Sequence, residues 1–108
     1  MVGYSYQDPS LNDTVWNDDK TASDIYLALQ DFFNVYPDFI NNQFFVTGES
    51  YGGVYVPTLT RLLIQQIQAG NSSINLAGMS IGNGMISTIQ DLRSLPDFMY
   101  FHGIYGKR

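Results

Sequence analysis

Cysteine is absent from the sequence, and basic residues are scarce. Without cysteine the chain has no thiol nucleophile and no thiolate ligand, which excludes thiol chemistry and cysteine-based metal sites. Lys and Arg number 5 against 10 Asp and Glu, and the cations form no cluster along the chain. Phosphate groups are bound by clustered cations, so nucleic acid is not an expected partner. The net charge of -5 is most simply a source of solubility.

Long apolar runs are also missing. No run reaches the roughly 18 residues that a membrane-spanning helix needs. Residues 1–6 lack both the basic start and the apolar stretch of a secretory signal peptide. We therefore expect neither a leader nor a membrane span in this chain, and we expect no cofactor and no metal site.

The residues that are present favour a folded protein. Apolar residues make up 44% of the 108 residues and aromatic residues 15%, which is enough to bury a core and too much for a disordered chain. No repeat, linker or low-complexity segment divides the sequence. We therefore treat residues 1–108 as a single domain or part of one.

Apolar spacing and turn residues predict helices that alternate with strands. In chain order we expect a short strand end at residues 2–6, a loop at 7–20, a helix from Thr21 to Pro37, a strand at 44–46, a tight turn at 48–53, a helix at 54–69, a strand at 74–81 and a helix at 88–101 interrupted at Pro96. This alternation implies parallel strands joined by crossover helices, and hence the α/β class.

Particular residues support the ends of these elements. Thr21 is expected to cap the first helix, with Asp24 in a position like that of a capping box. Pro57 is expected in the first turns of the second helix, where its missing N–H costs least, and Gly70 at its C-terminal end. The compact apolar run at residues 44–46 is typical of a buried strand.

Residues 48–52 read Gly-Glu-Ser-Tyr-Gly and match the pattern G-x-S-x-G, with Ser50 at the centre. They stand between a predicted buried strand and a predicted helix, which is the setting of a nucleophile elbow. Such a turn strains the serine backbone, exposes its hydroxyl and leaves no room for side chains at Gly48 and Gly52. The helix that follows points its positive end at the serine, where an oxyanion forms in acyl transfer. The backbone N–H of Tyr51 would be the first oxyanion donor. The alternative is an ordinary serine in a glycine-rich turn.

A serine nucleophile needs a base, usually a histidine oriented by an acid. The chain has 1 His, at position 102, whereas in hydrolases with this elbow the acid and the histidine follow later strands. Because His102 comes after only one more predicted strand, we interpret it as a structural or surface histidine. Asp91 and Asp97 fail as the triad acid for the same reason, and we expect them to cap or solvate the last helix.

The segment from Gly48 to Pro57 reads GESYGGVYVP. Other segments that belong with it are VGYSY at residues 2–6, ALQDFF followed by YP within residues 28–37, and IGNG at residues 81–84. In order and spacing they resemble the signature segments of the serine carboxypeptidase family, and especially its animal lysosomal members of the cathepsin A kind. The likeness extends over nearly the whole chain, so it is far more specific than the pentapeptide.

The resemblance implies an α/β-hydrolase fold, present here in part as central parallel strands with flanking helices. It implies a serine-type carboxypeptidase that removes C-terminal residues from peptides, without a cofactor and preferably at acidic pH. Ser50 would be the nucleophile, Tyr51 would supply an oxyanion N–H and line the substrate site, and Glu49 would bind the C-terminal carboxylate of the substrate. A carboxylic acid donates a hydrogen bond to a carboxylate only while it is protonated, so activity would fade as the pH rises.

Parts of the family's pattern are not found in these residues. The upstream Asn-Gly-Gly-Pro-Gly segment and the downstream catalytic Asp and His are absent, and Met1 stands where the family has Gly. We therefore expect residues 1–108 to be a segment of a full enzyme that is inactive by itself. Its uncovered sheet edges and apolar faces would favour aggregation.

Two other functions stay open at this point. Esterases and acyltransferases share the elbow chemistry, because fold alone does not fix function. A non-catalytic relative would keep the elbow as a scaffold for binding. Peptide turnover separates the carboxypeptidase from an esterase, and the reactivity of Ser50 separates both from the non-catalytic protein.

Asn12 and Asn71 begin N-x-S/T sequons and are candidate glycosylation sites if the chain is secreted. The resemblance to the family implies a lysosomal or secreted protein.

Overall fold

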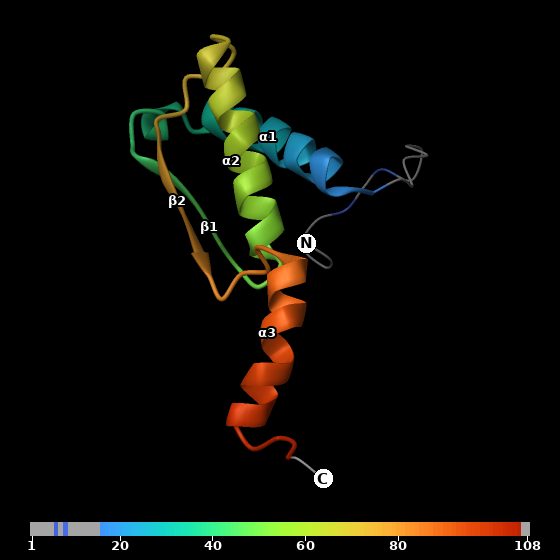
Figure 1. The fold of residues 1–108 in the computed structure, drawn as a ribbon. Helices are drawn as coiled ribbons and strands as arrows, with labels where there is room; N and C mark the ends of the chain where they lie inside the picture. The colour runs from blue at the N-terminus through green and yellow to red at the C-terminus, as the bar shows by residue number, and fades with distance from the viewer. Residues whose placement is uncertain (1–5, 7, 9–15, 107–108) are drawn as a thin grey trace.

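Figure 1 shows the chain as a computed structural model, which describes residues 6, 8 and 16–106. Its elements in chain order are α1 (Asp18–Val35), the 3-10 helix η1 (Pro37–Phe39), β1 (Phe44–Glu49), α2 (Gly52–Gln68), β2 (Leu76–Gly82) and α3 (Thr88–Phe101). Helices and strands alternate as predicted for an α/β chain. Of the strand end expected at residues 2–6 only Tyr6 is described, and Asn12 lies outside the described residues.

Helix α1 begins earlier than predicted, inside the segment expected to be loop. Asn17 caps it, because its side-chain oxygen accepts a hydrogen bond from the Lys20 N–H at 2.8 Å. Asp18 and its acidic neighbour occupy the first turn, where negative charge suits the positive end of the helix. Thr21 is therefore not the cap; its hydroxyl donates to the Asn17 carbonyl at 3.0 Å from within the helix. The predicted end is confirmed, since α1 stops at Val35 before a proline.

Strands β1 and β2 pair in parallel, with α2 as the crossover between them. The register runs from Phe44 beside Leu76 to Glu49 beside Gly82, so both strands end at the same level. The predicted parallel arrangement is confirmed. Both strands run to later residues than expected, and β2 begins at Leu76 rather than at residue 74.

The core lies between the sheet and the helices. Helix α2 contacts both strands and α1, which crosses it (Figure 1). The buried hydrophobic side chains are Ala22, Tyr26, Val46, Val56, Leu59, Leu63 and Ile74. Leu63, near the middle of α2, has no exposed surface. Burial on one side of α2 is what the helical spacing of its apolar residues requires.

Strand β1 is buried on one face only, so the expectation of a buried strand at residues 44–46 is wrong in part. Val46 faces the helices and is buried, whereas Phe45 is 55% exposed on the opposite face. The reason is that α2 packs on one face of the sheet, with α1 against α2. No other described element covers the opposite face.

Helix α2 starts at Gly52, two positions before the expected start. As a result Pro57 lies inside the helix rather than in its first turn, and its missing N–H leaves one helical hydrogen bond unmade. The predicted end at Gly70 is confirmed. Gly70 has φ 75°, and the N–H of Asn71 donates to the Gln66 carbonyl at 2.9 Å, which completes a Schellman cap.

Helix α3 spans the predicted residues but continues through Pro96 without the expected interruption. The side chain of Ser87 caps its start by accepting a hydrogen bond from the Gln90 N–H at 3.4 Å. Figure 1 shows the helix projecting away from the rest, and it packs against none of the other described helices and strands. Throughout the described ranges, no helix combines the length and apolar character needed to cross a membrane.

Replacing Leu63 by alanine tests the core directly. Leu63→Ala removes the most completely buried side chain and is expected to lower the free energy of unfolding by about 2–5 kcal/mol. Gln65→Ala, on the exposed side of α2, is the control and should change it by less than about 0.5 kcal/mol. Urea denaturation of the full-length protein measures both changes. Equal effects of the two substitutions would contradict this placement of the core.

Candidate active site

Ser50 lies at the turn between β1 and α2. Its φ is 57°, in the left-handed region that residues with a side chain rarely occupy, so the predicted strained turn is present. Because β1 ends at Glu49 and α2 begins at Gly52, only Ser50 and Tyr51 form the turn. Ser50 is exposed, which leaves its hydroxyl accessible to a reactant.

Backbone hydrogen bonds hold Ser50 on both sides. Its N–H donates to the Gly82 carbonyl at 3.2 Å, at the end of the neighbouring strand. Its carbonyl accepts hydrogen bonds from the N–H groups of Gly53 at 3.0 Å and Met85 at 2.8 Å. Within the described residues, the N–H of Tyr51 has no acceptor, and it lies at the positive end of α2. An anion beside Ser50 would therefore meet a free donor.

The two glycines of the G-x-S-x-G pattern differ in what they require. A Cβ at Gly48 would lie 2.8 Å from a methyl of Val56 and 3.2 Å from the Gly52 Cα, so no side chain fits there. A Cβ at Gly52 would meet only the same methyl, at 3.9 Å, which is an ordinary contact. The predicted crowding is present at Gly48 and wrong at Gly52, because a Cβ at Gly52 would have that methyl as its single neighbour within 4 Å.

The side chain of Tyr51 contacts one acidic side chain and one aromatic ring. Its hydroxyl lies 3.3 Å from each carboxylate oxygen of Asp18, in the first turn of α1. The ring of Tyr55 meets it edge-on, with the centroids 4.8 Å apart. The negative charge of Asp18 raises the pKa of Tyr51, since it disfavours the phenolate. Tyr51 therefore remains a hydrogen-bond donor, and it links the start of α1 to the elbow.

Glu49 is the last residue of β1, and it is exposed. Its partner in the sheet register is Gly82, which has no side chain that could cover the carboxylate. No hydrogen bond or ion pair involving the Glu49 side chain occurs among the described residues. A carboxyl group without other partners thus adjoins Ser50.

Residues 1–108 match the family described as serine carboxypeptidase. The chain belongs to the serine carboxypeptidase family. It is 44% identical to lysosomal protective protein of Mus musculus over 107 residues, which cover 99% of this chain and 21% of that protein. It is 41% identical to serine carboxypeptidase 1 of Hordeum vulgare over 95% of this chain and 21% of that protein. Serine carboxypeptidase-like 46 of Arabidopsis thaliana is 39% identical over 95% of this chain and 22% of that protein.

This serine carboxypeptidase chain thus spans about a fifth of the length of the relatives it matches. Glu49, Ser50 and Tyr51 are consecutive in the chain and lie together at the turn between β1 and α2. The structure does not bring His102 to that site. His102 caps the far end of α3, where its Nδ1 lies 2.8 Å from the Phe98 carbonyl and its ring stacks on Phe98. This position agrees with the interpretation of His102 as a structural residue.

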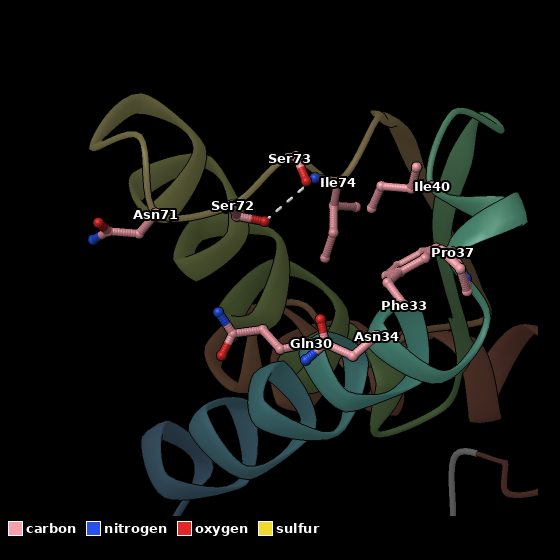
Figure 2. Close-up of a pocket in the computed structure, with 9 residues that line it drawn as sticks. All are labelled: Gln30, Phe33, Asn34, Pro37, Ile40, Asn71, Ser72, Ser73 and Ile74. Carbon is pink, nitrogen blue, oxygen red and sulfur yellow. Dashed lines mark hydrogen bonds between the residues drawn. The ribbon is translucent and has the colours of Figure 1, made fainter.

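The cavity shown in Figure 2 lies at the opposite end of the sheet from Ser50, between the end of α1 and residues 71–74. Its volume is about 390 Å³, and its lining includes the amides of Gln30 and Asn34 and the ring of Phe33. None of the residues that line it is titratable, so it does not supply acid–base chemistry. In the described part of the chain no group of His, Asp and Glu side chains could hold a metal ion.

Sequence reasoning did not identify two contributors to the site. Asp18 was expected in a loop, and the signal that could have placed it was the Asn-Asp-Asp run, which is typical of a helix start. Met85 acts through its backbone N–H, so its side chain carried no signal. Its approach to Ser50 becomes visible only in the structure, where β2 pairs with β1 and both strands end at the same level.

The Asp18 contact predicts a change in the titration of one tyrosine. Asp18→Asn removes the negative charge and is expected to lower the pKa of Tyr51 toward its ordinary value. Tyrosinate absorbance, recorded against pH in the full-length protein, measures this after subtraction of the Tyr51→Phe titration. Asp19→Asn is the control, because Asp19 pairs with Arg61 at 3.3 Å rather than with Tyr51. An unchanged curve for Asp18→Asn would refute the contact.

Proposed function

We propose that the protein is a serine-type carboxypeptidase that releases C-terminal residues from peptides through an acyl-enzyme at Ser50. The observation that carries the proposal is the strained Ser50 between a parallel strand and a helix N-terminus, in a chain of the serine carboxypeptidase family. The proposal assigns residues 1–108 to an α/β-hydrolase fold, of which they form a segment with central strands and flanking helices.

The chemistry follows from the geometry of the turn. The hydroxyl of Ser50 attacks the carbonyl carbon of the last peptide bond, and a base accepts the hydroxyl proton. The oxyanion that forms is stabilised by the free N–H of Tyr51 and by the positive end of α2. The C-terminal amino acid leaves with a proton, and water then hydrolyses the ester on Ser50. We place the base and its acid outside residues 1–108, so the isolated segment would not turn over peptides.

Glu49 is proposed to bind the C-terminal carboxylate of the substrate. Its carboxyl adjoins Ser50 and has no other partner among the described residues. When protonated, it can donate a hydrogen bond to the substrate carboxylate, whereas two ionised carboxylates repel. The substrate class is therefore a peptide with a free C-terminus, bound best at acidic pH.

The protein is proposed to enter the secretory pathway and to be lysosomal or secreted. A relative from Mus musculus bears the name lysosomal protective protein. Asn71, in a sequon, is exposed directly after the cap of α2, and its side-chain amide donates to the side-chain oxygen of Gln66 at 3.0 Å. An accessible turn of this kind suits glycosylation, and we propose Asn71 as a site. Asn12, outside the described residues, is proposed on its sequon alone.

Active-site labelling tests the proposed nucleophile. A fluorophosphonate is expected to label the full-length protein on the tryptic peptide that contains Ser50. Ser50→Ala should abolish labelling and lower kcat on the order of 10⁶-fold, as with other serine nucleophiles. Ser80→Ala, a substitution on β2, is the control and should label normally. Hydrolysis of a peptide with a free C-terminus, but not of its C-terminal amide, would identify a carboxypeptidase.

Other outcomes of the same experiment decide against the proposal in different ways. Labelling of Ser50 together with hydrolysis of esters alone would indicate an esterase or acyltransferase. A full-length protein that Ser50-directed reagents do not modify would be a non-catalytic relative that keeps the elbow as a scaffold.

The role of Glu49 predicts a change in the pH profile. In the wild type, kcat/KM for a peptide is expected to fall as the pH rises, because a carboxylic acid donates a hydrogen bond to the substrate carboxylate only while it is protonated. Glu49→Gln keeps a donor at every pH, so this fall should disappear. An ester substrate without a carboxylate is the control, and its profile should be the same in both proteins. Identical peptide profiles would rule out the carboxylate-binding role.

A further inference from the structure

The carbonyl of Ser50 is fixed by a segment from elsewhere in the chain. One of its donors, the Gly53 N–H at 3.0 Å, belongs to the elbow itself. The other, the Met85 N–H at 2.8 Å, follows β2. Met85 arrives there because β2 ends level with β1 and the chain then turns at Asn83, whose φ is 47°. The turn after β2 therefore meets the turn after β1.

Holding this carbonyl also orients an N–H group. The Ser50 carbonyl and the Tyr51 N–H belong to one planar peptide unit, and the bond between them is trans. In a trans unit the C=O and N–H bonds point in opposite directions, so fixing one fixes the other. The N–H of Tyr51 is left without an acceptor in the described structure, and it is directed away from Met85.

We propose that the backbone N–H of Met85 positions the Ser50–Tyr51 peptide, so that the Tyr51 N–H is aimed at the oxyanion formed on Ser50. This inference rests on the proposed acyl-transfer function and adds a second segment to its machinery. Met85 touches no reacting atom and is a positioning residue. Its contribution is geometric, since an oxyanion donor is effective only when it is aligned before the charge develops.

Gly53 provides the space for this contact. A Cβ at Gly53 would lie 2.6 Å from the backbone N and C atoms of Met85, which no real side chain tolerates. From the other side, a Cβ at Gly84 would lie 3.2 Å from the Gly53 Cα. Two backbones thus pass each other with no side chain between them. Gly52, the preceding residue of the same helical turn, has room for a methyl group, with its single neighbour at 3.9 Å.

The adjacent glycines give a matched pair of variants of the full-length enzyme. Gly53→Ala displaces Met85 and is expected to lower kcat roughly 10²-fold, the effect of a misplacement of about 1 Å. KM should change little, because the donor acts on the transition state. Gly52→Ala adds the same methyl group one position away and should keep kcat near the wild-type value. Titration with a fluorophosphonate gives the active fraction, so that kcat is expressed per reactive Ser50.

A peptide aldehyde separates positioning from general damage. It adds to the serine as a tetrahedral adduct whose oxygen needs the same donor, so its affinity should fall by the same factor as kcat/KM in Gly53→Ala. A partly unfolded variant would instead lose active fraction and keep its affinity. Incorporation of the α-hydroxy-acid analogue of methionine at position 85 removes the N–H without adding bulk. This substitution should lower kcat and the affinity for the aldehyde by the same factors as Gly53→Ala. If Gly53→Ala does not fold, the substitution at position 85 tests the proposal in its place.

The inference fails if the enzyme that carries the α-hydroxy-acid analogue at position 85 keeps the wild-type kcat and the wild-type affinity for the aldehyde. It also fails if Gly52→Ala lowers kcat as much as Gly53→Ala does. In both cases an active, labelled wild-type enzyme would leave the proposed function intact. A wild type that neither labels at Ser50 nor turns over any acyl substrate overturns the function and the inference together.

Discussion

Ser50 is kept at φ 57° by hydrogen bonds from its own helical turn and from the end of the neighbouring strand β2. A non-glycine residue in that region costs about 1–3 kcal/mol, and it persists only where other contacts offset the strain. Here the N–H donates to Gly82, and the carbonyl accepts from Gly53 and Met85. Each such bond contributes about 0.5–1.5 kcal/mol, so together they match the strain. Because Gly82 ends β2 and Met85 follows it, the elbow exists only while β2 pairs with β1.

The core and the elbow are joined through α2. Val56 is 3% exposed in the core, and a methyl of the same side chain lies 2.8 Å from the place that a Cβ on Gly48 would take. Leu63, two turns further along, fixes the middle of the helix against the sheet and α1. A shift of α2 along its axis would therefore disturb the packing of Val56 and move the positive end of the helix relative to Ser50. Stability and the geometry of the site depend on the same few contacts.

The sequence allowed prediction of those features that arise from local patterns. Apolar spacing located α1, β1, α2, β2 and α3, and the elbow pentapeptide located the turn at Ser50. The start of α1 was misplaced because Asn17 and Thr21 are both good caps, and the acidic residues that follow Asn17, which favour the earlier start, were not weighed. The continuity of α3 through Pro96 was missed because proline disfavours a helix without forbidding it.

The long-range contacts of the site could not be predicted in the same way. The hydrogen bond from Met85 depends on the register of the two strands, and a backbone N–H has no residue signature. The approach of Asp18 to Tyr51 depends on how α1 crosses α2. Crowding was assigned to Gly52 from the pattern alone, whereas the close approach of another backbone occurs at Gly53. A glycine in a motif shows that a side chain is absent, and only the structure shows what replaces it.

Tyr51 is therefore held by two contacts with different physical character. Its peptide N–H is oriented through the neutral backbone bond from Met85, which neither salt nor pH weakens directly. Its ring is held by Asp18 at 3.3 Å from each oxygen, a long and exposed contact with a charge, which salt screens. Under the proposed mechanism, the bond from Met85 would orient the oxyanion donor, and the contact with Asp18 would set the shape of the substrate site. Changes in ionic strength can thus loosen the ring while the oxyanion donor keeps its direction, because the two contacts come from different elements.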